Sequence, residues 1–220
     1  MLEMNATPRL RRVKQGYTSG ARSFATRSVT SLARTGITPN ILTAAGVSLC
    51  LAAAILVPFE SHGKLLFFWL AAGTFVVGSL LDILDGALAR VGGKTTPFGA
   101  FIDSTTDRVG EGAMLAAIAL VFSRHGKDWA VVLAVAAVVG SFLVSYTRAR
   151  AEALGLRGDV GLGSRAERVV LITAGLVFAP WGGLPWAIVA LAATAWLTVV
   201  QRILHVRKQL SGGTSGSNER

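Results

Sequence analysis

Four aspartates lie close together in a chain that is otherwise strongly apolar. Asp82 and Asp85 are three positions apart, and Asp103 and Asp107 are four positions apart. In a helix, either spacing puts both side chains on one face. The segment VGGKTTP between the two pairs is short and contains glycine and proline. We therefore expect an antiparallel helical hairpin in which the two acidic pairs face each other.

Such a group of carboxylates calls for a cation. Like charges and burial both disfavour the ionised form, so four neighbouring carboxylates cannot all stay charged unaided. One or two divalent cations would resolve the conflict, and oxygen-only ligands favour Mg²⁺ or Mn²⁺ over zinc. The alternatives are helix capping, ion pairs with Arg90 and Arg108, or an ion pathway of the transporter kind. Capping explains one aspartate but not four on two helices.

Small residues accompany the acids. Gly86 follows Asp85, Ala89 lies one turn later, and Gly99 precedes Asp103 by four positions. Each of them alone would suit plain helix packing. Together with the carboxylates they favour a slot in which a metal-bound diphosphate approaches the backbone closely.

The composition indicates that these helices lie in a membrane. Of the 220 residues, 52% are hydrophobic and 15% are charged, and the mean hydropathy is +0.54. The net charge of +10 does not indicate a nucleic-acid partner, because the cations stand between long apolar runs. Cys50 is the only cysteine, so the sequence has no disulfide framework. It lies in an apolar run and suits a core position.

The pattern predicts an all-α membrane protein with six transmembrane helices and an N-terminal amphipathic juxtamembrane helix near residues 20–34. We expect a basic juxtamembrane segment at 1–38, a transmembrane domain at 39–208 and a flexible tail at 209–220. The predicted spans are 39–58, 65–90, 99–122, 129–152, 167–181 and 185–205. With the N-terminus in the cytoplasm, the outer loops hold only the cations Lys64, Arg124 and Lys127. Both termini and the acidic site are therefore expected on the cytoplasmic side of the plasma (inner) membrane.

The acidic segment resembles a known family signature. Asp82-x-x-Asp85-Gly86-x-x-Ala89-Arg90, eight further residues, and Gly99-x-x-x-Asp103-x-x-x-Asp107 match the pattern of the CDP-alcohol phosphotransferases at every specified position. The resemblance implies transfer of a phosphatidyl group from CDP-diacylglycerol to an alcohol, with release of CMP.

The resemblance also implies roles for single residues. Asp82, Asp85 and Asp103 would bind Mg²⁺, with two ions expected and Mn²⁺ as an alternative. Asp107 would contribute to the second ion and act as the general base on the acceptor hydroxyl. The nucleotide-lipid site would be formed by Pro39, Asn40, Thr43, Asp82, Gly86, Ala89, Arg90 and Gly99.

Arginines near the cytoplasmic ends of the later predicted spans suggest a phosphorylated acceptor, because guanidinium groups bind phosphate oxygens in a bidentate manner. The segment at residues 145–168 is similar to the corresponding segment of the actinobacterial phosphatidylinositol phosphate synthases. That likeness implies inositol 1-phosphate as acceptor and a homodimer, which the small residues of the fourth predicted span allow. The acceptor-phosphate residues carried over are Arg148, Arg150, Arg165, Arg168 and Arg202. Plain positive-inside charge in contact with membrane lipids is the alternative explanation of this cluster.

Other functions remain open at this stage. Glycerol 3-phosphate as acceptor, which would make phosphatidylglycerophosphate, or an archaeal-type ether-lipid donor fits the same chemistry. An ion-coupled transporter would hold its acids near the bilayer midplane, whereas these acids are predicted near the cytoplasmic boundary. A scaffold protein would leave the spacing of the acids without a purpose.

Overall fold

The computed structural model describes residues 38–93, 95–161 and 163–213, and in these ranges it contains helices and no strand. This confirms the all-helical class. The predicted amphipathic helix near residues 20–34 lies outside the described residues. The elements are α2 (Pro39–Leu56), the 3-10 helix η1 (Val57–His62), α3 (Lys64–Val91), α4 (Pro97–Arg124), α5 (Asp128–Ala153), α6 (Arg165–Phe178), the 3-10 helix η2 (Ala179–Trp181) and α7 (Leu184–Gly213).

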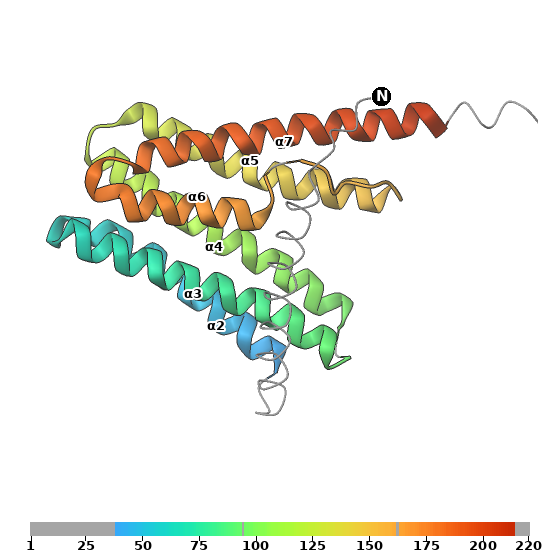
Figure 1. Ribbon diagram of the computed structural model, residues 1–220, viewed down its shortest axis with the longest axis horizontal. Coiled ribbons are helices and arrows are strands. Elements are labelled where there is room, and N and C mark those ends of the chain that lie inside the picture. Colours follow the sequence, from blue (N-terminus) through green and yellow to red (C-terminus); the bar gives the residue numbers. More distant parts are fainter. Residues whose placement is uncertain (1–37, 94, 162, 214–220) are drawn as a thin grey trace, which may run out of the picture.

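The helices run up and down, so their connections collect at two ends of the molecule (Figure 1). One end holds the start of α2, the α3–α4 turn, the α5–α6 connection and the end of α7. The other end holds η1, the α4–α5 turn and η2. The four aspartates belong to the first of these ends, because they flank the α3–α4 turn. The predicted short turn between the two acidic helices is present, but α3 and α4 do not pack on each other as the predicted hairpin required: α2 packs against both of them, and α3 also packs on α6.

Glycines bring α2, α3 and α4 close together. A Cβ atom on Gly78 of α3 would lie 2.8 Å from the carbonyl oxygen of Gly46 on α2 and 2.8 Å from Cys50 Sγ. A Cβ atom on Gly110 of α4 would lie 3.0 Å from Cys50 Cβ. The buried Cys50 is therefore a core residue where three helices meet, as the sequence predicted. Close approach of this kind is how helices associate when lipid surrounds them.

A second set of small residues joins α5 to α7. Ala134 and Ala137 are fully buried within the chain, and a Cβ atom on Gly140 would lie 3.0 Å from Ala195 Cβ. Trp196 of α7 donates a hydrogen bond from Nε1 to the carbonyl oxygen of Ala136 at 3.0 Å. The small residues that allowed a homodimer interface are thus used for packing inside one chain, and the homodimer stays a prediction.

Four segments are long and apolar enough to cross a membrane: Pro39–His62, Lys64–Val91, Asp128–Ala153 and Leu184–Ser211. The predicted spans 99–122 and 167–181 do not meet the same standard. The first half of α4 is polar because it carries the acidic site, and α6 has only 14 residues. In addition, α7 continues to Gly213, so the predicted tail boundary at residue 208 falls inside a helix. No glycine interrupts that helix before residue 212.

Candidate active site

Three of the four aspartates form a group with the geometry of a metal site. Asp82 and Asp85 lie on α3 and are buried, and Asp103 lies on α4 and is half-buried. One carboxylate oxygen from each lies within 4.8 Å of the other two. The helix spacings and the short α3–α4 turn therefore bring these three acids together as expected.

The residues present fit a divalent cation. Thr43 of α2 donates a hydrogen bond to Asp85 Oδ2, and the second oxygen of Asp85, Oδ1, is buried without a hydrogen-bond partner. A buried carboxylate oxygen without a partner is costly unless a cation or donor meets it. With carboxylate oxygens as the only ligands, the chemistry suits Mg²⁺ or Mn²⁺.

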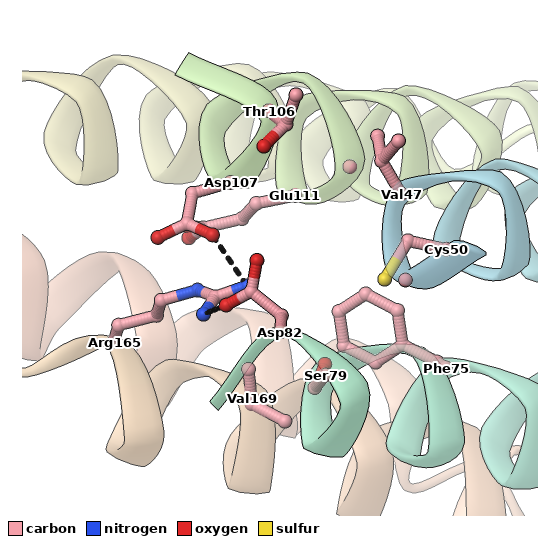
Figure 2. Close-up of a pocket in the computed structure, with 12 residues that line it drawn as sticks. Val47, Cys50, Phe75, Ser79, Asp82, Thr106, Asp107, Glu111, Arg165 and Val169 are labelled. Atoms are coloured by element: carbon pink, nitrogen blue, oxygen red, sulfur yellow. Dashed lines mark hydrogen bonds and ion pairs between the residues drawn. The ribbon is translucent and has the colours of Figure 1, made fainter. Parts of the chain in front are cut away.

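The fourth aspartate, Asp107, lies outside this group of three and is paired with an arginine of α6. Arg165 reaches between the two acidic helices, where its Nη1 contacts Asp82 Oδ2 and its Nη2 lies 2.6 Å from Asp107 Oδ1 (Figure 2). Arg165 therefore joins α3, α4 and α6 through one side chain. Participation of Asp107 in a second metal site stays a prediction.

The alternative of ion pairs with Arg90 and Arg108 is not what the described residues form. Arg108 turns back to donate to the carbonyl oxygen of Ser104 in its own helix, and Arg90 is exposed. Neither makes a salt bridge with the four aspartates within the described ranges. The arginine that does so, Arg165, is 83 positions from Asp82 in sequence.

The pocket around Arg165 is narrow and has one apolar wall. Val47, Cys50 and Phe75 form that wall, and the polar groups of Asp82, Asp107 and Arg165 point toward one another beside it (Figure 2). The enclosed space is about 10 Å³, which is room for about one water molecule. An apolar wall beside the charges keeps water out and strengthens their interactions.

The α5–α6 connection is held against α7 through glycines. Gly163 donates its backbone N–H to Thr198 Oγ1 at 2.8 Å, and a Cβ atom on Gly163 would meet the same oxygen at 2.8 Å. Gly161 adopts a φ of 114°, a left-handed backbone conformation that favours glycine, and it also packs on Thr198. The glycines of this connection therefore let the backbone lie directly on a helix.

The five predicted acceptor arginines occupy different environments. Arg148 pairs with Glu152 at 2.9 Å on the surface, and Arg150 is exposed. Arg168 and Arg202 are buried, and Arg202 donates from Nε to the carbonyl oxygen of Val160 at 2.8 Å. The charges of Arg148 and Arg168 both act on Arg202, so these three gather at one place. Their role as phosphate ligands stays a prediction.

The residues predicted to bind the nucleotide lipid lie on α2, on α3 and in the first turn of α4. Pro39 opens α2, Asn40 is exposed in the same turn, and Thr43 reaches Asp85. Gly99 donates its N–H to Thr96 Oγ1 at 2.9 Å, which caps α4 at the turn before the acids. Gly86 and Ala89 are half-buried on α3 beyond the carboxylates. No described contact tests whether these positions bind a nucleotide.

Sequence reasoning missed one buried acid near the site. Glu111 lies on α4 one turn beyond Asp107 and is buried. Its carboxylate meets Arg168 through two hydrogen bonds, at 2.7 Å and 2.9 Å. The signal in the sequence was an acid four positions after Asp107 inside an apolar run.

Fold and site together define a helical, multi-pass membrane protein with a divalent-metal centre suited to phosphoryl chemistry. Comparison with known proteins gives the family. The model of the CDP-alcohol phosphatidyltransferase family matches residues 36–204, and the chain belongs to this family.

Curated relatives and solved structures agree with this assignment. The chain is 42% identical over 183 residues to the phosphatidylinositol phosphate synthase of Mycolicibacterium smegmatis, covering 79% of each chain. It is 36% identical over 184 residues to the archaetidylinositol phosphate synthase of Pyrococcus horikoshii, covering 83% of this chain and 90% of that one.

Two crystal structures of Mycobacterium tuberculosis phosphatidylinositol phosphate synthase are similar to this fold, each with a TM-score of 0.73. One has CDP-DAG bound, shares 32% identity and covers 83% of this chain and 92% of that chain. The other contains manganese and citrate, shares 33% identity and covers 83% and 88%. The family assignment decides against the transporter and scaffold alternatives.

Proposed function

We propose that this protein transfers the phosphatidyl group of CDP-diacylglycerol to inositol 1-phosphate, forming phosphatidylinositol phosphate and CMP. The observation that carries the proposal is that Asp82, one of the three grouped carboxylates, contacts Arg165, which also meets Asp107 in the same pocket. A carboxylate group for a metal and a guanidinium for a phosphate are the two partners that such a transfer needs. The names of the relatives support inositol phosphate as the acceptor.

In this proposal three of the four aspartates bind the metal and the fourth acts as the general base. Asp82, Asp85 and Asp103 would hold the metal, and Thr43 orients Asp85 by its hydrogen bond. When bound, a divalent cation neutralises the diphosphate and stabilises the departing CMP. Asp107 accepts the proton of the acceptor hydroxyl as that oxygen attacks the β-phosphorus. Arg165, which lies 2.6 Å from Asp107, would hold the acceptor phosphate so that its hydroxyl faces this carboxylate.

The remaining arginines would line the acceptor pocket from the other side. Arg202 is held by the carbonyl oxygens of Val160 and Val144, and Arg148 and Arg168 lie within its electrostatic range. Several positive charges at one place favour a phosphorylated acceptor over an uncharged alcohol.

We further propose that the chain crosses the membrane six times, with its termini and the site in the cytoplasm. Four helices qualify by composition, and α4, with 28 residues, is about 42 Å long, which exceeds a hydrocarbon core of about 30 Å. Its polar half would face the site rather than lipid. The short α6 continues through η2, where the exposed Trp181 suits a membrane interface. A homodimer is proposed from the likeness to relatives alone.

The proposal is tested by offering phosphorylated alcohols to the purified protein with CDP-diacylglycerol and Mg²⁺. CMP release should depend on inositol 1-phosphate. If CMP release depends on glycerol 3-phosphate and does not respond to inositol 1-phosphate, glycerol 3-phosphate is the acceptor and the proposal is wrong on this point. A parallel assay with a CDP-linked archaeal ether lipid tests the donor, since one relative is an archaetidylinositol phosphate synthase.

A further inference from the structure

Glu111 is a buried acid that neither the family signature nor the three-carboxylate group includes. It lies on α4 four positions after Asp107, and its side chain is 9% exposed. Figure 2 shows Glu111 and Asp107 extending from the same stretch of α4 toward Arg165. Glu111 therefore places a buried charge in the same pocket as Asp107 and Arg165.

Glu111 is paired with Arg168 of α6, and both oxygens of its carboxylate accept a hydrogen bond from this arginine. Nε and Nη2 of Arg168 donate to the two oxygens of Glu111 at 2.7 Å and 2.9 Å, and Nη1 donates to the carbonyl oxygen of Gly163 at 2.9 Å. Both side chains are buried. Because an unpaired buried charge is costly, removal of either partner must disturb the other.

The Arg168–Glu111 pair lies one helical turn from the Arg165–Asp107 pair of the proposed reaction site. Asp107 and Glu111 are four positions apart on α4, and Arg165 and Arg168 are three positions apart on α6, so each acid meets one arginine. The backbone of α6 packs on α3 and α7. These two side-chain pairs join α6 to α4, and the Arg168–Glu111 pair limits where Arg165 can lie relative to Asp107.

The same pair also anchors the glycine-rich connection. Arg168 holds the carbonyl oxygen of Gly163, while the N–H of Gly163 donates to Thr198 of α7. Through Arg168, the carboxylate of Glu111 thus fixes the first turn of α6 and the residues that lead into it. The first turn of α6 carries Arg165 and Arg168, two of the five arginines assigned to the acceptor, whereas α2 and α3 carry most of the residues predicted for the nucleotide lipid.

We propose that Glu111 is a positioning residue that, through Arg168, sets the place of Arg165 and the α5–α6 connection for the acceptor phosphate. This inference rests on the proposed function for the identity of the acceptor. Loss of Glu111 should act on the acceptor more than on the donor. A displacement of about 1 Å at a reacting group can cost about 100-fold in rate, so we expect kcat/KM for the acceptor to fall about 10- to 100-fold, with a raised acceptor KM as part of this loss.

The experiment compares Glu111→Gln, Arg168→Gln and the double variant in steady-state assays with each substrate varied in turn. We expect both single variants to raise the acceptor KM while the donor KM changes less than about twofold. The double variant should be no worse than the more affected single variant, because both act through one contact. The control is Glu60→Gln, which removes the charge of a buried acid that lies 2.8 Å from the exposed His125 at the other end of the molecule.

Three outcomes would overturn the inference. Acceptor binding lost in Arg168→Gln but intact in Glu111→Gln would make Arg168 act on its own. Changes in thermal stability alone, as expected for Glu60→Gln, would make the pair merely structural. Multiplying effects in the double variant would show two independent roles. If Glu111→Gln does not fold, Glu111→Asp, which keeps the charge and Arg168 but shortens the side chain, must show the raised acceptor KM.

The proposed function fails separately from this inference. If the wild-type protein uses a different phosphorylated alcohol, the same variants are assayed with that alcohol, and the positioning role of Glu111 is judged on its KM.

Discussion

Replacement of Arg165 by glutamine should have opposite effects on metal binding and on turnover. Arg165 is a cation that already contacts Asp82, a predicted metal ligand, and lies 2.6 Å from Asp107. A metal ion held by Asp82 and this guanidinium would therefore compete for the Asp82 carboxylate and repel each other. Glutamine removes the competing charge but also removes the group proposed to hold the acceptor phosphate. We expect tighter metal binding together with slower transfer.

The size of the effect follows from the burial of the pair. A hydrogen bond to a charged group contributes about 1.5 to 3 kcal/mol. The Arg165 side chain is 29% exposed, so solvent screens part of this interaction and the lower end of the range applies. About 1.4 kcal/mol corresponds to a factor of ten. The affinity for Mn²⁺ should therefore rise about tenfold.

The measurement is Mn²⁺ binding to the detergent-purified protein without substrates, followed by electron paramagnetic resonance, alongside CMP release at saturating donor. Arg148→Gln is the matched control, because Arg148 pairs with Glu152 on the surface and should leave Mn²⁺ affinity unchanged. If Arg165→Gln binds Mn²⁺ as the wild type does, or more weakly, competition between the two cations is refuted.

Three further predictions concern single residues. Asp107→Asn should slow CMP release about 10²- to 10⁴-fold, the usual contribution of a general base, while CDP-diacylglycerol still binds in a calorimetric titration; normal turnover would remove the proposed base. Asp85→Asn should lower Mn²⁺ affinity by at least the about 10- to 100-fold that is typical of losing a residue that only supports a metal ligand, and an unchanged titration would exclude Asp85 as a ligand. Gly78→Val should destabilise the fold by about 1 to 3 kcal/mol, because its Cβ would lie 2.8 Å from Gly46 O. Thermal unfolding checks this last change against Gly73→Ala, whose Cβ meets nothing within 4 Å.

Much of the acidic centre was predictable because its geometry is local. Helix periodicity pairs Asp82 with Asp85, and the short α3–α4 turn keeps the start of α4 near the end of α3, so Asp103 joins them. The apolar runs likewise predicted the positions of α2, α3, α5 and α7. The count of six spans was less secure, because the polar half of α4 and the shortness of α6 weaken the signal that hydropathy provides.

The arginines were predictable as a group but not in their contacts. Their number and placement indicated a phosphate, yet nothing local separates Arg165, which meets Asp82 and Asp107, from Arg168, which meets Glu111. The two lie three positions apart at the start of one helix. Their different partners follow from how α6 packs against the other helices.

The sequence by itself determined the family signature, the helical class and the pairing of acids along each helix, because these depend on residues within a few turns of one another. Only the tertiary structure decided which cation meets which acid. Arg165 and Asp82 are 83 positions apart, and Arg168 and Glu111 are 57 apart. Contacts over such separations depend on the packing of whole helix faces, on the glycines that let helices approach, and on the loss of solvent around each charge.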